Sequence, residues 1–157
     1  MARELPKVYE PQQVENRIYQ MWEESGYFAP QGKADAKPFT IVMPPPNVTG
    51  SLHMGHAMNQ VLTDIMCRYK RMCGFDVLWQ PGTDHASIAT QLLVERDLSK
   101  RGINPHSLSL QEKLDAAWAW KADKGGQIMN QLHILGVTPV WQRERFTMDQ
   151  GLSDAVT

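Results

Sequence analysis

Two histidines, His53 and His56, have the spacing and the surroundings of a polyphosphate site. Residues three apart share one face of a helix, so the two rings are expected to be neighbours. Gly55 between them removes a side chain at a point where a flat ring could lie close to the backbone. Each imidazole can donate a ring N–H to a phosphate oxygen, and such donors matter most where charge develops in a transition state. The pattern indicates nucleotide chemistry.

Two other interpretations of the histidine pair stay open at this point. An H-x-x-H pair is often no more than two capped, hydrogen-bonded histidines on a helix surface. Nearby histidines also bind zinc, but here no third ligand follows at an obvious spacing and no glutamate lies between the pair. We therefore expect no metal site.

The elements around the pair are those that bind phosphate in α/β proteins. Residues 39–43 are short, β-branched and apolar, which predicts a parallel strand buried on both faces. Three prolines end that strand, and Ser51 in the turn that follows is a candidate N-cap. Apolar residues then recur at helical spacing from His53 to about Met72. A strand, a tight turn and a helix N-terminus together present backbone N–H groups and a positive dipole to an anion.

Asn47 and Asp84 each follow a predicted strand. The second strand covers residues 75–80 and ends at a Pro-Gly-Thr turn just before Asp84. Ligands of open parallel sheets bind beyond the carboxyl ends of the strands, so these two side chains are expected to converge on one crevice. Asp84 is also a candidate N-cap for a helix that starts near Ala86, and both roles are compatible. For His85, a structural and a catalytic role both stay open.

Further helices complete an α/β pattern. We expect them at residues 11–25, 86–100 and 109–135, with a new helix opening at Asp149. Ser109 and Glu112 have the spacing of a capping box.

Two pairs of residues inside the long helix stand out. Gly125 and Gly126 lower its stability and mark a kink or close packing. Trp118 and Trp120 cannot both face the core, so at least one is expected to be partly exposed.

The composition of the 157 residues is that of an ordinary globular domain with a net charge of −1. There is thus no overall basic field of the kind that drives non-specific nucleic-acid binding. Two short basic clusters are expected to be solvated helix faces: Arg68, Lys70 and Arg71, and Arg96, Lys100 and Arg101. The two cysteines, Cys67 and Cys73, indicate neither a disulfide framework nor a metal site. No apolar run approaches about 20 residues and no secretory leader is visible, so we expect a cytoplasmic protein without a membrane segment.

Two long motifs then resemble one family. The segment from Met43 to Ala57 contains His53-Met54-Gly55-His56, which is similar to the H-x-G-H motif of class I aminoacyl-tRNA synthetases. Its triple proline followed by Asn-Val-Thr-Gly resembles the valyl form of that motif rather than the isoleucyl or leucyl form. The segment from Pro81 to Gln91 also resembles this form, except that the family usually has glycine where this chain has Ser87. Shorter similarities cover Tyr9–Trp22 and Phe146–Asp149, so nearly the whole chain takes part.

The resemblance implies ATP-dependent activation of valine, with Mg²⁺, followed by transfer of the valyl group to tRNA(Val). His53 and His56 would then contact the phosphates as the catalytic residues, and Gly55 would lie under the adenine. Asn47 and Asp84 would hold the valine ammonium, and Pro45 would line the side-chain pocket. A carboxylate suits an ammonium, and a proline forms a rigid apolar wall for a branched aliphatic group.

The resemblance also implies a domain organisation. Residues 1–38 would form an N-terminal helix and connection. Residues 39–157 would form the first half of a Rossmann-like catalytic domain, with a parallel sheet and flanking helices, truncated before the editing insertion. The family's K-M-S-K-S loop is absent from the sequence. We therefore expect an N-terminal catalytic fragment with little activity alone and few tRNA contacts.

Two alternatives remain to be tested. Small nucleotidyltransferases carry H-x-G-H after a strand and are complete near this length. They do not explain the triple proline or the segment around Asp84. The other alternative is a non-catalytic nucleotide-binding module derived from a synthetase.

Overall fold

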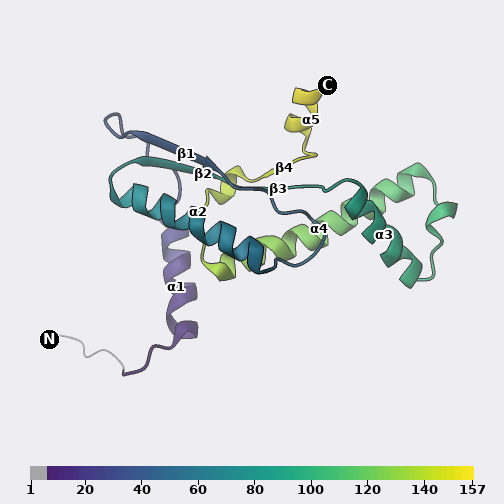
Figure 1. Cartoon of the computed structure of the whole chain (residues 1–157), viewed down its shortest axis with the longest axis horizontal. Coiled ribbons are helices and arrows are strands. Elements are labelled where there is room, and N and C mark those ends of the chain that lie inside the picture. Colours follow the sequence, from purple (N-terminus) through teal and green to yellow (C-terminus); the bar gives the residue numbers. More distant parts are fainter. Residues whose placement is uncertain (1–6) are drawn as a thin grey trace.

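The computed structural model describes residues 7–157, so the first six residues of the predicted N-terminal region 1–38 lie outside the described part. Its centre is a β–α–β unit in which strand β1 (Pro38–Val42) pairs in parallel with β2 (Asp76–Gln80), with Phe39 opposite Val77. The connecting helix α2 (Met54–Met72) packs on both strands, and Figure 1 shows it lying beneath them. Parallel strands need such a crossover. The predicted α/β class, with a parallel sheet, flanking helices and an N-terminal helix, is confirmed.

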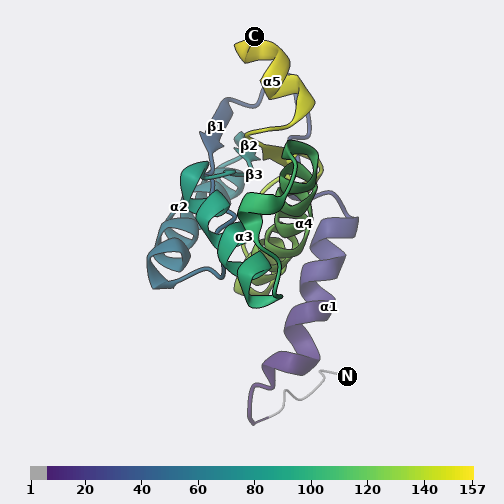
Figure 2. The ribbon, with the colours of Figure 1, turned by 90° about the vertical axis from the view of Figure 1, so that its right-hand side faces the viewer.

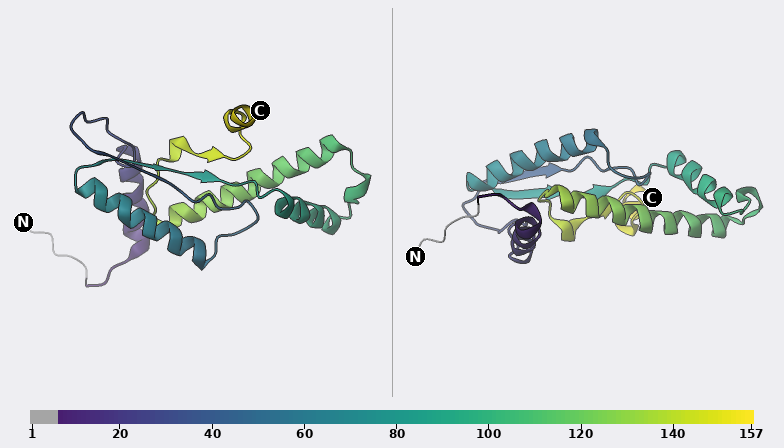
Figure 3. Two further views of the ribbon diagram at one scale, coloured as in Figure 1. Left: turned by 45° about the horizontal axis from the view of Figure 1, so that its top comes forward. Right: turned by 90° about the horizontal axis from the view of Figure 1, so that it is seen from below.

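A second, shorter pair of parallel strands continues from the first. β3 (Gly82–Thr83) follows β2 after one residue and pairs with β4 (Arg145–Phe146). Two long helices lie between these strands in the sequence, α3 (Ile88–Lys100) and α4 (Leu110–Leu135), and they pack side by side (Figures 2 and 3). Ser109 and Glu112 form the predicted capping box at the start of α4. Short 3₁₀ turns, Pro105–Ser107 and Trp141–Arg143, join these elements.

The core lies against one face of the β1–β2 sheet. Val77 and Trp79, two residues apart on β2, point to the same face and are buried. They pack with Cys67 of α2 and with Ile128 and Leu132 of α4. Helices α2 and α4 therefore cover the same face of the sheet.

The prediction that the first strand is buried on both faces is wrong. Thr40 and Val42 are exposed, whereas Phe39 and Ile41 are half-buried toward the core. The reason is that helices α2 and α4 cover one face of the sheet, and within residues 7–157 nothing covers the other face.

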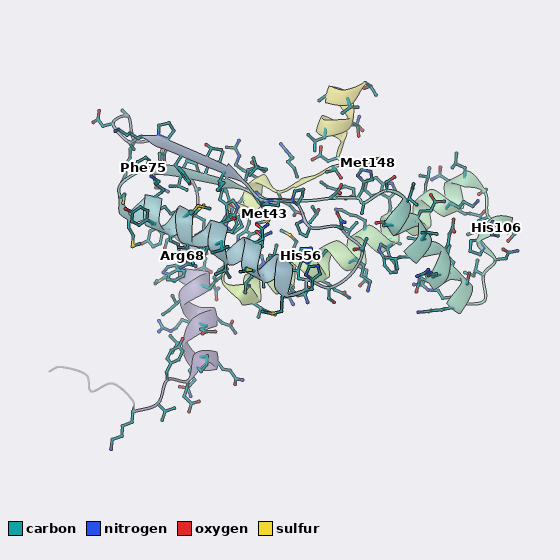
Figure 4. All side chains as sticks on the ribbon, in the orientation of Figure 1. Met43, His56, Arg68, Phe75, His106 and Met148 are labelled. Atoms are coloured by element: carbon teal, nitrogen blue, oxygen red, sulfur yellow. The ribbon has the colours of Figure 1, made fainter. Side chains whose placement is uncertain are left out.

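The first basic cluster is not the solvated face that the sequence predicts. Arg71 donates to the Thr138 hydroxyl and carbonyl at 2.7 and 2.9 Å and to the Phe28 carbonyl at 3.0 Å. Arg68 donates to the buried Asp64 carboxylate and to the Gly136 carbonyl, and Figure 4 labels it where α2 meets α1. Lys70 lies over the Phe75 ring. The sequence could not reveal these partners because they come from distant segments. The second cluster, by contrast, is exposed on α3 as predicted.

Of two predictions about α4, one is confirmed and one is not. Trp118 is half exposed, while Trp120 is partly buried and donates its indole N–H to the Val48 carbonyl at 2.8 Å, so the prediction that the two cannot both face the core is confirmed. The helix runs unbroken through Gly125 and Gly126, and a Cβ added at either meets nothing within 4 Å. Close packing does not explain the glycine pair, and nothing in the structure does.

The terminal helices project from this body. Helix α1 (Pro11–Glu24) is attached through Tyr19, whose hydroxyl donates to the Val137 carbonyl at 2.7 Å and accepts from the Trp141 indole at 2.8 Å. Helix α5 (Gln150–Val156) follows Asp149, so the predicted helix opening there is confirmed, and Asp149 is its N-cap. This helix points away from α1 (Figure 2). Across residues 7–157, no helix has both the length and the apolar character needed to cross a membrane.

Candidate functional site

His53 and His56 cap the N-terminus of α2 together. The His53 Nδ1 accepts from the Gly55 N–H at 3.1 Å, and the His56 Nδ1 accepts from the His53 N–H at 3.2 Å. This reciprocal arrangement is a capping box, so His53 is the N-cap and the prediction of Ser51 in that role is wrong. The ring centroids lie 3.8 Å apart. Figure 4 shows His56 at this end of the helix.

The capping fixes where the ring protons are. A neutral imidazole has one donor and one acceptor nitrogen, and both Nδ1 atoms are acceptors here. Each neutral ring therefore carries its proton on Nε2 and can donate it outward. Partial burial, and then the neighbouring His53, lower the pKa of His56 below its ordinary 6.5. The N-terminus of α2 thus presents two ring donors together with its dipole, which suits an anion.

Gly55 has a structural role that the sequence reasoning missed. A Cβ at this position would lie 3.0 Å from the Cε1 of His53 and 3.1 Å from its Nδ1. The absence of a side chain therefore lets the His53 ring fold back onto the helix start. The H-x-G-H spacing predicts this role of the glycine if the first histidine is taken as the N-cap of the helix.

Asn47 and Asp84 lie side by side, as the sequence predicts. They form a parallel bridge in which the Val48 N–H donates to the Asp84 carbonyl and the Asp84 N–H to the Pro46 carbonyl, both at 2.9 Å. Asn47 is exposed and Asp84 half exposed, so a ligand can reach both. Pro45 is also exposed, and its Cβ lies 4.0 Å from where a Cβ on Gly82 would be. All three predicted valine-binding residues thus gather at one end of the sheet.

The loop from Pro44 to Leu52 joins the two groups, and it is held at several points. Gln131 of α4 accepts the Leu52 N–H at 2.8 Å, and Gln60 of α2 donates to the Pro44 carbonyl at 3.4 Å. The Trp120 indole bonds to Val48 in the middle of the loop. These contacts fix the Asn47 end and the His53 end of the loop on the same pair of helices.

Asp84 does not cap the helix that follows it. Helix α3 begins only at Ile88, and no side chain caps it. The Asp84 Oδ1 instead accepts the Thr147 hydroxyl at 2.9 Å. Thr147 also contacts both the main chain and the ring of His85, at 2.9 and 2.6 Å. Sequence reasoning gave Thr147 no role, because its partners are 62 and 63 residues away.

A cavity of about 310 Å³ opens beside this cluster. Its lining is mainly apolar and includes His85, Val48, Trp118, Phe146 and Met148. His53 and His56 do not line it, so it is separate from the histidine cap. Residues 7–157 contain no group of three or more His, Cys, Asp or Glu side chains arranged to hold a metal ion.

Comparison with known proteins decides the family. The family described as tRNA synthetases class I (I, L, M and V) matches residues 17–157. The chain belongs to this family. The small nucleotidyltransferase alternative is therefore excluded, because the match extends far beyond the H-x-G-H motif.

The relatives of this class I synthetase chain are much longer than it is. It is 55% identical over 154 residues to a valine–tRNA ligase of Geobacter sulfurreducens, covering 98% of this chain and 17% of the relative. It is 53% identical to that of Streptomyces coelicolor, covering 99% of this chain and 18% of the relative. The chain thus spans about a sixth of the length of these curated relatives.

A solved structure has the same fold. The Agrobacterium radiobacter LeuRS–tRNA–LeuAMS ternary complex matches with a TM-score of 0.72 and 21% sequence identity, over 92% of this chain and 17% of the other. The described β–α–β arrangement is therefore that of a class I synthetase.

Proposed function

We propose that this chain supplies the valine-binding and phosphate-binding half of a valine–tRNA ligase. The observation that carries the proposal is the loop from Pro44 to Leu52. Its first part aligns Asn47 with Asp84, and its end leads into the two imidazoles whose Nδ1 atoms accept, which leaves Nε2 of each ring as the donor. Relatives with more than 50% identity are valine–tRNA ligases, which supports valine as the amino acid.

In this proposal the two ends of the loop bind the two substrates. Asp84 and the Asn47 amide oxygen accept N–H bonds from the valine ammonium, and Pro45 contacts the isopropyl group. His53 and His56 donate from Nε2 to the phosphates of ATP, and the exposed backbone at Gly55 leaves room for the adenine.

The reaction that follows needs no covalent enzyme intermediate. A valine carboxylate oxygen attacks the α-phosphorus of ATP and forms a new P–O bond, while the bond to the β-phosphate breaks and pyrophosphate leaves. The chain contributes by aligning the reactants and by stabilising the charge on the phosphates. A Mg²⁺ ion commonly binds through substrate phosphates with few protein ligands, so in this proposal it arrives with ATP.

The proposal extends to the organisation and setting of the protein. Residues 1–38 form the N-terminal helix and connection, and residues 39–157 form the first half of the catalytic domain, ahead of the editing insertion. The valyl group is then transferred to tRNA(Val), to which this chain makes few contacts. The activity belongs in the cytoplasm, where translation consumes the product.

Valine-dependent ATP–pyrophosphate exchange on the unsubstituted chain tests the adenylation step. We expect at most weak exchange from the chain alone, and the His53→Ala/His56→Ala variant should lower that exchange rate by at least about 100-fold, since both donors to the phosphates are removed. Exchange that persists undiminished in this variant would contradict the assignment of the two histidines.

Binding tests amino-acid identity independently of turnover. Together with ATP, valine should raise the melting temperature of the chain more than isoleucine does, and an Asp84→Asn variant should lose this protection. Stronger protection by isoleucine would show that the valyl assignment is wrong. Protection without exchange would favour the non-catalytic binding module.

A further inference from the structure

Thr147 connects the two polar side chains beyond β3. Its hydroxyl oxygen is 2.9 Å from the Asp84 Oδ1, 2.6 Å from the His85 Nδ1 and 2.9 Å from the His85 main-chain nitrogen. The Asp84 and His85 side chains remain about a third exposed, at 34% and 38%. The cluster is thus fixed from within and open to a ligand from outside.

The three contacts of Thr147 fix the direction of every hydrogen bond. A hydroxyl has one proton to donate and two lone pairs. The Asp84 carboxylate can only accept, so it takes the hydroxyl proton, and the His85 main-chain N–H can only donate. The remaining lone pair must then accept from the His85 ring, which places a proton on Nδ1. In the neutral ring, Nε2 is then an acceptor, and it has no hydrogen-bond partner within residues 7–157.

The backbone holds Thr147 in this position. The Thr147 N–H donates to the Thr83 carbonyl at 3.1 Å, which continues the β3–β4 pairing by one residue. The adjacent Phe146 ring is buried and lies edge-on to the His85 ring, with centroids 6.5 Å apart. A residue from the C-terminal part of the chain is thereby placed on the loop that carries Asp84.

The Thr147 hydroxyl also keeps the His85 ring from donating a hydrogen bond to the Asp84 carboxylate. The His85 Nδ1 lies 3.4 Å from the Asp84 Oδ1, slightly beyond a normal hydrogen bond, with the Thr147 oxygen in contact with both. Without that oxygen, the shortest move available to Nδ1–H is a direct bond to Asp84. Such a bond would use an acceptor that a substrate ammonium needs.

We propose that Thr147 is a positioning residue that orients Asp84 toward the substrate ammonium and holds His85 in its Nδ1–H form, with Nε2 left as an acceptor. The inference rests on the proposed function, in which Asp84 binds the valine ammonium. It adds a residue from the far end of the sequence to the amino-acid site.

The ring nitrogens of His85 test the hydrogen-bond network directly. Long-range ¹H–¹⁵N correlation spectra at pH about 8, where an ordinary imidazole is neutral, distinguish the two ring tautomers. A His85→Gln variant assigns the signals. We expect the Nδ1–H pattern in the unsubstituted chain and in Thr147→Ser, and altered His85 ring shifts in Thr147→Val. An Nε2–H pattern in the unsubstituted chain, or unchanged shifts in Thr147→Val, would overturn the proposal.

Valine affinity tests the positioning of Asp84. In calorimetric titrations with ATP present, Thr147→Val should weaken valine binding about tenfold. Thr147→Ser, which keeps the hydroxyl, should bind valine within about twofold of the unsubstituted chain. Thr40→Val, an exposed threonine on β1, is the matched control and should bind as the unsubstituted chain does. Equal affinity in Thr147→Val would overturn the positioning role. If the unsubstituted chain binds no valine, the proposed function fails, while the ring spectra still decide whether the Thr147 network exists.

Discussion

At the scale of single residues, Ser87 stands out because of its backbone. It has φ 44° and ψ −117°, directly after Ala86 at φ 55°, and both are left-handed conformations that side chains with a Cβ rarely adopt. Only glycine adopts such angles without strain. The turn between His85 and α3 therefore stores conformational energy in this chain.

We expect Ser87→Gly to stabilise the chain by about 1 kcal/mol, because the strain of a non-glycine residue in this region is relieved. Urea unfolding followed by circular dichroism measures the change. Ser99→Gly, in the last turn of α3, is the control and should destabilise slightly, by about 0.5 kcal/mol. A loss of stability in Ser87→Gly would show that the serine is not strained.

A second residue-scale prediction concerns pH. The folded chain lowers the pKa of His56, through partial burial and then through His53, so the unfolded chain binds its proton more readily. Stability from this group is complete above the ordinary value of 6.5 and is lost as the pH falls from there through the lowered pKa of the folded chain. Urea midpoints should therefore fall between pH 7.5 and pH 5.5 by more in the unsubstituted chain than in His56→Gln. Equal losses would show that His56 contributes nothing to the pH dependence.

At the scale of elements, Arg71 anchors α2 to the segment that follows α4. Its guanidinium bridges Thr138 and Phe28, and the same Thr138 donates its N–H and hydroxyl to the buried Asp64 at 2.9 and 2.6 Å. The chain leaving α4 is thereby directed toward β4, and β4 carries Thr147 to Asp84. A side chain that the sequence assigned to solvent thus helps to assemble the candidate site.

Arg71→Met should lower the free energy of unfolding by about 3 kcal/mol. The carbonyls of Phe28 and Thr138 lose their donor, and Asp64 loses a nearby positive charge. Chemical denaturation measures this cost. Arg96→Met, exposed on α3, is the matched control and should change stability by less than about 0.5 kcal/mol. Equal effects of the two substitutions would show that the Arg71 contacts add nothing.

At the scale of the whole molecule, the outer face of α2 is apolar and uncovered. Its exposed side chains recur at helical spacing: Met54, Met58, Val61, Leu62, Ile65, Tyr69 and Met72. Contiguous apolar patches of this kind mark surfaces that associate with other protein. Within residues 7–157, β1 also leaves one edge unpaired, which adds a row of free backbone groups.

We expect the isolated chain to self-associate through this face of α2. Sedimentation velocity should show oligomers whose fraction rises with concentration, and the Met58→Lys/Ile65→Lys variant should sediment as a monomer. Both side chains are exposed, so the substitutions should leave the fold intact. Val156→Lys, an exposed residue on α5, is the control and should associate as before. Persistent oligomers in the double variant would place the contact elsewhere.

The local sequence predicted the elements well because their signals are short-range. The capping box at Ser109 and Glu112, the helical spacing through α2 and the proline stop after β1 each act within a few residues. One error arose because the partner is distant: Asp84 bonds to Thr147 rather than to its own helix. The Ser51 error is local, because the N-cap is His53, two residues further along the chain.

The sequence by itself determined the family and the order of the longer strands and helices, and it supplied the candidate site residues, whereas the short strands β3 and β4 were not predicted. Motifs such as His53-Met54-Gly55-His56 act through neighbouring atoms, so their meaning is local. Only the tertiary structure decided which face of β1 is buried, that Arg71 is a structural anchor, and that Thr147 reaches Asp84 and His85. The Arg71 and Thr147 contacts join segments more than 60 residues apart, and no local pattern in one sequence encodes such a pairing.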